Sequence, residues 1–130
     1  MDWRNSHYSI FNRCNILDEG IGETQMKKPT PENAVKAEVK KYLHLTGWFV
    51  FPILQGLGAY RGISDMIAIK NGLVLFVECK SKRGSLSGDQ MRFREHVRWN
   101  GGHYVVARGY EDVKDYVEKV WNDEHERSVG

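Results

Sequence analysis

Three charged residues stand at the ends of two apolar segments, and their types are those of a hydrolytic site. Asp65 opens the first segment, Glu78 and Lys80 close the second, and Asn71-Gly72 joins the two segments. Asn-Gly between apolar runs is the strongest short-range signal of a β-hairpin with a two-residue turn. In that register Asp65 lies directly opposite Glu78, and like charges so placed repel each other unless a cation compensates them.

The cation that suits two facing carboxylates is Mg²⁺, which takes oxygen ligands and is commonly held by one or two carboxylates together with a substrate phosphate. Glu78 and Lys80 are two residues apart on one strand and therefore point to the same face. Cys79 points to the other face, so its thiol is a packing group and only its backbone carbonyl lies near the metal edge. A lysine in this place can orient a water, help to deprotonate it, or stabilise charge on a phosphate. These parts predict phosphodiester hydrolysis, against the alternative of a solvated strand-end Glu and Lys beside an unrelated Asp.

Two further polar residues lie on apolar helix faces. Glu32 falls within the arc of Val35, Val39 and Leu43, which suggests a third acidic group near the site. An acid in the first turn also favours the helix dipole, and that alternative stays open. Gln90 could hold a phosphate or a water in the site, or simply bond the backbone as the fourth residue of a capping box.

The chain supplies these residues from seven predicted elements. Pro31 at the first helical position and an i, i+4, i+8 apolar spacing from Val35 predict a helix that Gly47 ends. Ser87 and Gln90 have the spacing of a capping box that opens a second helix. An α/β chain is therefore expected, with a helix at 31–46, a strand at 48–51, a glycine-rich loop at 55–62, strands at 64–70 and 73–80, a helix at 87–100, a strand at 103–107 and a last helix through 113–120.

Composition excludes several other classes of protein. The chain has 130 residues, 41% of them hydrophobic and 28% charged, which suits one globular domain. No apolar run approaches the ~20 residues of a membrane helix, and the first ten residues lack a signal-peptide pattern. Two cysteines are too few for a disulfide scaffold or a structural zinc site. We therefore expect no membrane association and an intracellular, cytoplasmic location.

The net charge of +2 conceals a basic middle and an acidic end. Residues 80–98 hold six basic and two acidic residues, whereas residues 109–130 hold three basic and seven acidic ones. A basic block of this kind either contacts nucleic-acid phosphates or forms a solvated helix surface. The residues expected to contact DNA are Arg61, Lys82, Arg83, Arg92 and Arg94, with Arg98 and Tyr60 beside them.

The order of these motifs resembles the PD-(D/E)XK nuclease superfamily, and more narrowly its stand-alone VRR-NUC branch. That branch has a Glu on its first helix, an Arg-x-Gly-x-(Pro/Ser)-Asp motif, a Glu-x-Lys motif and a downstream Gln. Glu32, the segment from Arg61 to Asp65, Glu78 with Lys80, and Gln90 match these in turn, over roughly residues 30 to 107. Ser64 stands where many members carry Pro.

The resemblance implies a restriction-endonuclease-like fold, in which a mixed central β-sheet is flanked by helices in the order αβββαβα. It implies Mg²⁺ or Mn²⁺ bound by Asp65, Glu78 and the backbone carbonyl of Cys79, with Lys80 near the attacking water and Gln90 and Glu32 among the catalytic residues. It also implies a homodimer similar to Holliday-junction resolvases. A twofold assembly presents the same site twice, which suits symmetric nicking of a branched substrate.

The resulting prediction is a metal-dependent DNA endonuclease, with branched DNA such as Holliday junctions and plain duplex both open as substrates. The alternative is a non-catalytic nucleic-acid-binding module on a nuclease-like scaffold, since fold alone does not establish activity. A small-molecule enzyme is disfavoured because the sequence has no P-loop, dinucleotide fingerprint or nucleophile elbow. We expect an irregular N-terminal extension at 1–26, the VRR-NUC-like nuclease domain at 27–124 and a C-terminal tail at 125–130.

Overall fold

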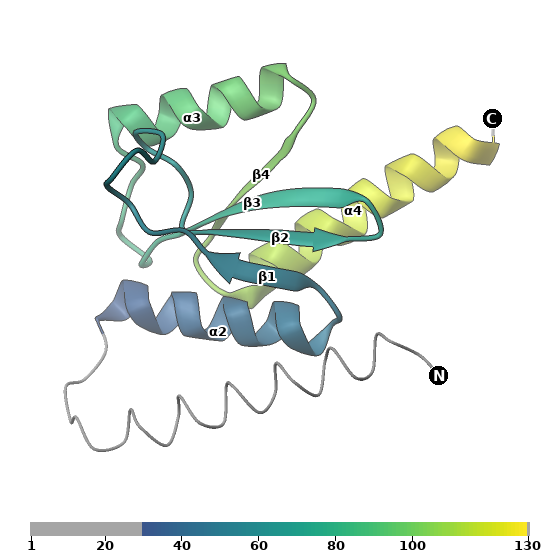
Figure 1. Cartoon of the computed structure of the whole chain (residues 1–130). Helices are drawn as coiled ribbons and strands as arrows, with labels where there is room; N and C mark the ends of the chain where they lie inside the picture. Colours follow the sequence, from purple (N-terminus) through teal and green to yellow (C-terminus); the bar gives the residue numbers. More distant parts are fainter. Residues whose placement is uncertain (1–29, 130) are drawn as a thin grey trace. The chain divides into compact units, whose positions relative to one another are not determined.

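The computed structural model describes residues 30–129, in which the helices and strands follow the predicted order. The α/β class is therefore confirmed (Figure 1). Within residues 30–129, no helix combines the length and apolar character that crossing a bilayer requires. The elements are α2 (Pro31–Leu45), β1 (Phe49–Pro52), β2 (Met66–Lys70), β3 (Leu73–Cys79), α3 (Gly88–Trp99), β4 (His103–Ala107) and α4 (Tyr110–Val129).

The four strands form one mixed sheet in the order β1-β2-β3-β4. β1, β2 and β3 pair antiparallel, and β4 joins β3 in parallel after the α3 crossover. Lys70 pairs with Leu73, and Asn71 and Gly72 have φ values of 51° and 82°, which are typical of a type I′ turn. The predicted hairpin register is confirmed. Pro52 ends β1, an edge strand, where a missing N–H is tolerated.

Helices cover both faces of the sheet, and Figure 1 shows α2 and α3 on opposite sides of it. α2 and α4 contact each other and pack on the same face, where alternate strand residues form the main core. Leu75 and Val77 on β3 and Val39 on α2 are fully buried there. α3 covers the other face near β3 and β4, where Phe93 lies against Phe76 and Tyr104.

Local signals explain where the helices begin and end. Gly47, with φ of 89°, follows α2 and lets the N–H of Trp48 bond the carbonyl of Leu43. α3 has the predicted capping box, because the side chains of Ser87 and Gln90 each bond the other's backbone N–H.

The last helix is longer than its apolar spacing predicts. α4 continues to Val129, so residues 125–129 of the expected C-terminal tail belong to this helix. The apolar spacing stops near Trp121, and no Gly or Pro follows until Gly130, so periodicity alone gave no sign of the exposed, charged last turns. The predicted extension at residues 1–26 lies outside the described residues.

Candidate active site

Three carboxylates meet at one edge of the sheet. Glu32 comes from the first turn of α2, Asp65 immediately precedes β2, and Glu78 is the penultimate residue of β3. One oxygen of each carboxylate lies within 4.8 Å of the others. Figure 1 shows the starts of α2 and β2, the end of β3 and the glycine-rich loop gathered at the left of the fold. The three acids that the sequence singles out are thus brought together, and we call them the acidic cluster.

Asp65 is held differently from the prediction. The β2–β3 ladder ends at Met66 and Val77, so Asp65 and Glu78 do not form the directly opposed ladder pair expected from the sequence. Instead, Oδ2 of Asp65 accepts a hydrogen bond of 2.7 Å from the backbone N–H of Cys79. The Asp65 carboxylate binds this N–H just beyond the Met66–Val77 pair, where the regular ladder ends. Asp65 and Glu78 nevertheless stay close together.

Glu78 is the most constrained member of the acidic cluster. Its side chain is only 1% exposed, Oε1 accepts a 2.8 Å hydrogen bond from Nε2 of Gln90, and Nζ of Lys80 lies 3.6 Å from Oε1. Oε2 is buried and has no hydrogen-bond partner among residues 30–129. Burial, and then the Asp65 charge, raise the pKa of Glu78 to about 7, although Lys80 opposes the shift.

Lys80 and Cys79 lie on opposite faces of the sheet, as the alternation of side chains along a strand requires. Lys80 lies mostly buried beside Glu78. Cys79 is fully buried in the main core, and burial raises the pKa of its thiol to about 12. A thiol in this state stays protonated at neutral pH and is not a metal ligand. The role of the Cys79 carbonyl as a ligand stays a prediction.

Lys36 is a charged neighbour of the acidic cluster that was not predicted from the sequence. Its Nζ lies 3.2 Å from Oδ1 of Asp65 and 3.8 Å from Oε1 of Glu32. Burial lowers the pKa of Lys36, but the carboxylates of Asp65 and Glu32 more than offset this, so the pKa is raised. The spacing of one helical turn between Glu32 and Lys36 was a signal, because i, i+4 residues share a helix face.

Gln90 fills the capping role and also bonds Glu78, while its role in holding a phosphate or a water stays a prediction. Its Oε1 accepts the N–H of Ser87 at 2.9 Å, while its Nε2 donates to Glu78. One side chain therefore caps α3 and fixes the orientation of a carboxylate in the acidic cluster.

A close contact between the glycine-rich loop and α3 aligns Asp65 with Gln90. Gly62 has φ of 82°, and a Cβ built there would lie 2.3 Å from the carbonyl oxygen of Asp89. Only glycine fits both the backbone conformation and the space. The loop is also tied by Gln55, whose Nε2 donates to the carbonyl of Ile63 at 3.3 Å.

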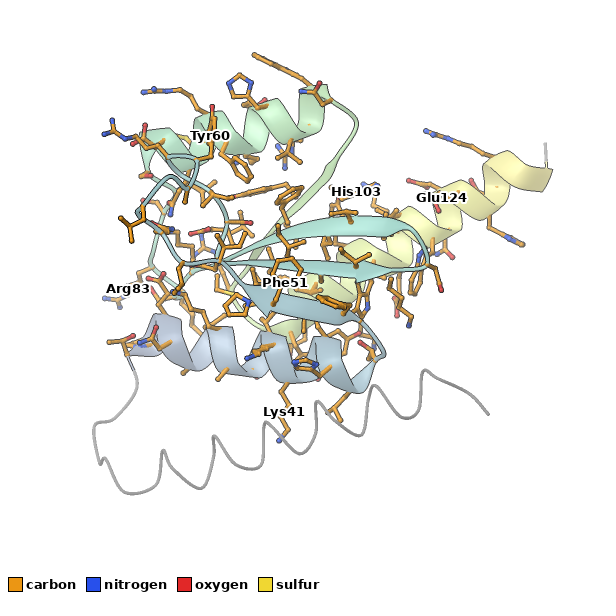
Figure 2. The ribbon with its side chains drawn as sticks, viewed as in Figure 1. Lys41, Phe51, Tyr60, Arg83, His103 and Glu124 are labelled. Carbon is orange, nitrogen blue, oxygen red and sulfur yellow. The ribbon has the colours of Figure 1, made fainter. Side chains whose placement is uncertain are left out.

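The basic residues expected to contact DNA fall into two groups. Lys82 and Arg83 are exposed on the loop that follows β3, and Figure 2 shows Arg83 at the left of the molecule, towards the start of α2. Arg108, which the sequence analysis missed, donates to the carbonyls of Ser81 and Lys82 and so ties this loop to the end of β4. No sequence pattern indicated that contact.

The second group lies on the glycine-rich loop and α3. Arg61 is 87% exposed and Arg92 is also exposed, and both are loosely paired with Asp89. Arg94 is only 27% exposed, and its Nε donates to Glu95 at 3.2 Å. Arg94 is therefore less available to a phosphate than the sequence suggested.

The acidic cluster fits a divalent cation. Hard cations such as Mg²⁺ favour carboxylate oxygens, and the buried Oε2 of Glu78 is left without a hydrogen-bond partner by residues 30–129. Glu32, Asp65 and Glu78 would hold the ion, and Gln90 would keep Glu78 in place.

A comparison with known structures identifies the fold. A solved chain described as "VRR_NUC domain" superimposes with a TM-score of 0.61 at 23% sequence identity, and the match covers 69% of this chain and 97% of that one. No protein-family model matches the sequence, and no curated protein matches it. The fold is therefore that of a VRR-NUC domain, which confirms the restriction-endonuclease-like arrangement implied by the sequence motifs.

Proposed function

We propose that this chain is a metal-dependent DNA endonuclease that hydrolyses phosphodiester bonds. One observation carries the proposal: the buried carboxylate of Glu78, a member of the acidic cluster, has one oxygen without a partner among residues 30–129 and a lysine 3.6 Å from its other oxygen. A purely structural carboxylate would be costly to bury in this form, because buried polar atoms are normally hydrogen-bonded. The VRR-NUC fold supports the same assignment.

Each residue of the site has a distinct part in the proposed reaction. Glu32, Asp65 and Glu78 would hold Mg²⁺ or Mn²⁺, which would lower the pKa of a coordinated water and polarise a phosphoryl oxygen. Lys80 stabilises the negative charge that grows on the phosphate as the water oxygen attacks phosphorus and an ester P–O bond breaks. Gln90 positions Glu78.

Two exposed basic segments bring DNA to this edge. Lys82 and Arg83 on one side and Arg61 and Arg92 on the other are free enough of strong ion pairs to meet phosphates. Such contacts position the backbone and carry no base sequence. Branched DNA, including a Holliday junction, is the substrate that we propose to test first, with linear duplex as the comparison.

The homodimer and the intracellular location stay predictions. Light scattering during gel filtration measures the mass in solution. A monomer at working concentration would contradict the expectation that a dimer with two active sites makes paired cuts. Phe49, Phe51 and Ile69 are exposed apolar side chains on the sheet and would be the first substitutions if a dimer is found. Fractionation of the source cells tests the location.

The test is cleavage of labelled four-way junction and matched linear duplex with Mg²⁺, with Mn²⁺ and with chelator. Wild type is compared with Asp65→Ala and Lys80→Ala, and Lys41→Ala serves as control because Lys41 points away from the domain (Figure 2). Metal-dependent cutting that both site variants lose and the control keeps is the expected result. Binding without cutting in either metal would replace the nuclease with a binding module.

A further inference from the structure

Three aromatic side chains form a row along the outer side of α3. The ring centroids of Tyr60 and His96 are 6.4 Å apart, and those of His96 and Trp99 are 5.9 Å apart. Tyr60 comes from the glycine-rich loop and is 55% exposed, while Trp99 is 76% exposed. Figure 2 shows Tyr60 lying along α3. We call Tyr60, His96 and Trp99 the aromatic row.

Arg61 and Arg92 lie beside Tyr60, the first residue of the aromatic row. Arg92, His96 and Trp99 follow at i, i+4 and i+7 and so share one stripe of α3. A hollow of about 290 Å³ is lined by Tyr60, Arg61, Asp89 and Arg92. Asp89 lies 4.0 Å from Arg61 and 3.7 Å from Arg92, and such long, exposed ion pairs contribute little. Both guanidinium groups can therefore turn to a phosphate without losing a strong partner.

The aromatic row starts beside the acidic cluster. Gly62 touches the backbone of Asp89, and the next residue, Gln90, bonds Glu78. From Arg92 the stripe continues for seven residues, or roughly 10 Å at the rise of an α-helix. A strand bound at the acidic cluster can therefore continue along α3.

Exposed aromatic side chains with arginines beside them suit unpaired bases. Bases stack on aromatic side chains with little sequence preference, and arginine contributes to the same surfaces. A continuous duplex hides its base faces and offers only phosphates and groove edges to this surface. The rings therefore contribute to DNA binding by stacking when the strand beside the cut is single-stranded.

We propose that the aromatic row, with Arg61 and Arg92, binds unpaired nucleotides adjacent to the cleavage point, so that the substrate is duplex DNA carrying a single-stranded segment. This inference rests on the proposed nuclease function. It assigns the recognition of the single strand to the aromatic row. The competing outcome of the test is that a protein partner binds the same rings.

The test is anisotropy of labelled DNA in chelator, which separates binding from cleavage. Three probes are compared: an oligothymidine, a blunt duplex and the same duplex with a single-stranded arm. Trp99→Ala and Tyr60→Ala should each weaken binding of the single strand and of the armed duplex by about 5- to 100-fold. Trp99→Phe should restore most of it, and Tyr110→Ala, at the start of α4, is the matched aromatic control.

The outcomes are distinguishable from those of the nuclease test. Loss of single-strand affinity in both alanine variants supports the inference whether or not the protein cuts. If wild type binds the armed and blunt duplexes equally, or if the variants bind the single strand as wild type does, the inference is overturned even for an active nuclease. A change in the oligomeric state of Trp99→Ala with unchanged DNA binding also overturns it, because the rings would then form a protein interface.

Discussion

Nζ of Lys36 lies 3.2 Å from Oδ1 of Asp65, so a cation from α2 already accompanies the acidic cluster. Glu32, one turn earlier on the same helix, shares this lysine at 3.8 Å. Three carboxylates at one edge repel one another, and the ammonium relieves part of that repulsion. A divalent ion placed among the same oxygens would be repelled by the ammonium, so we expect Lys36 to oppose metal binding.

Lys36→Met should tighten metal binding. The removed charge is partly exposed, so the expected gain in Mn²⁺ affinity is modest, about two- to fivefold, and smaller at high salt. Titration calorimetry with Mn²⁺ measures it, with Lys41→Met as the matched control on the outer side of α2. Weaker Mn²⁺ binding in Lys36→Met than in the control would show that Lys36 supports the metal site.

The raised pKa of Glu78 predicts how stability depends on pH without metal. The group binds its proton with a pKa of about 7 in the folded chain, against an ordinary value of 4.5. Its stabilising contribution is therefore complete below the ordinary value and is lost as pH rises through about 7. At about 1.4 kcal/mol per pKa unit, the loss is at most about 3.5 kcal/mol.

Urea denaturation in chelator tests this effect against Glu78→Gln, which does not titrate. The free energy of unfolding of wild type should fall relative to the variant between about pH 5 and about pH 8. Adding Mg²⁺ should reverse the trend, because the ion favours the ionised carboxylate. A difference between the two proteins that stays constant with pH would contradict the assignment.

The contact of Gly62 with α3 predicts an asymmetry between two glycines. Gly62→Ala forces a side chain into the left-handed region, which costs about 1–2 kcal/mol, and also drives its Cβ against the backbone of Asp89. Gly58→Ala has a similar φ of 91° but meets nothing within 4 Å. We expect Gly62→Ala to lower the free energy of unfolding by more than Gly58→Ala, and to reduce cleavage as well. Equal losses in urea denaturation would mean that the loop moves away from α3 without cost.

The sequence predicts best where one local rule decides the structure. Asn71-Gly72 set the hairpin register, and Ser87 with Gln90 set the start of α3, because both signals act within four residues. The position of Asp65 was harder, since its hydrogen bond to the Cys79 N–H depends on where the ladder ends.

Contacts between distant elements were the part that the sequence did not reveal. Lys36 reaches Asp65 only because α2 packs on the sheet, and Arg108 reaches the loop after β3 only because β4 lies beside that strand. The pairing of Arg94 with Glu95 was visible in the sequence as adjacent charges, but its reduced exposure depends on tertiary packing.

The two bonds of Gln90 can be separated by substitution. Ser87→Ala removes the hydroxyl cap of α3 and leaves the bond from Gln90 to Glu78, so the expected loss is about 1 kcal/mol of stability with cleavage retained. Gln90→Ala removes its part of the capping box and also frees Oε1 of Glu78, so cleavage should fall at least tenfold at a similar cost in stability. Urea denaturation and single-turnover cleavage on the same preparations supply both quantities. Parallel losses of activity in the two variants would show that Gln90 acts through the helix cap alone, whereas loss confined to Gln90→Ala would assign it to the positioning of Glu78.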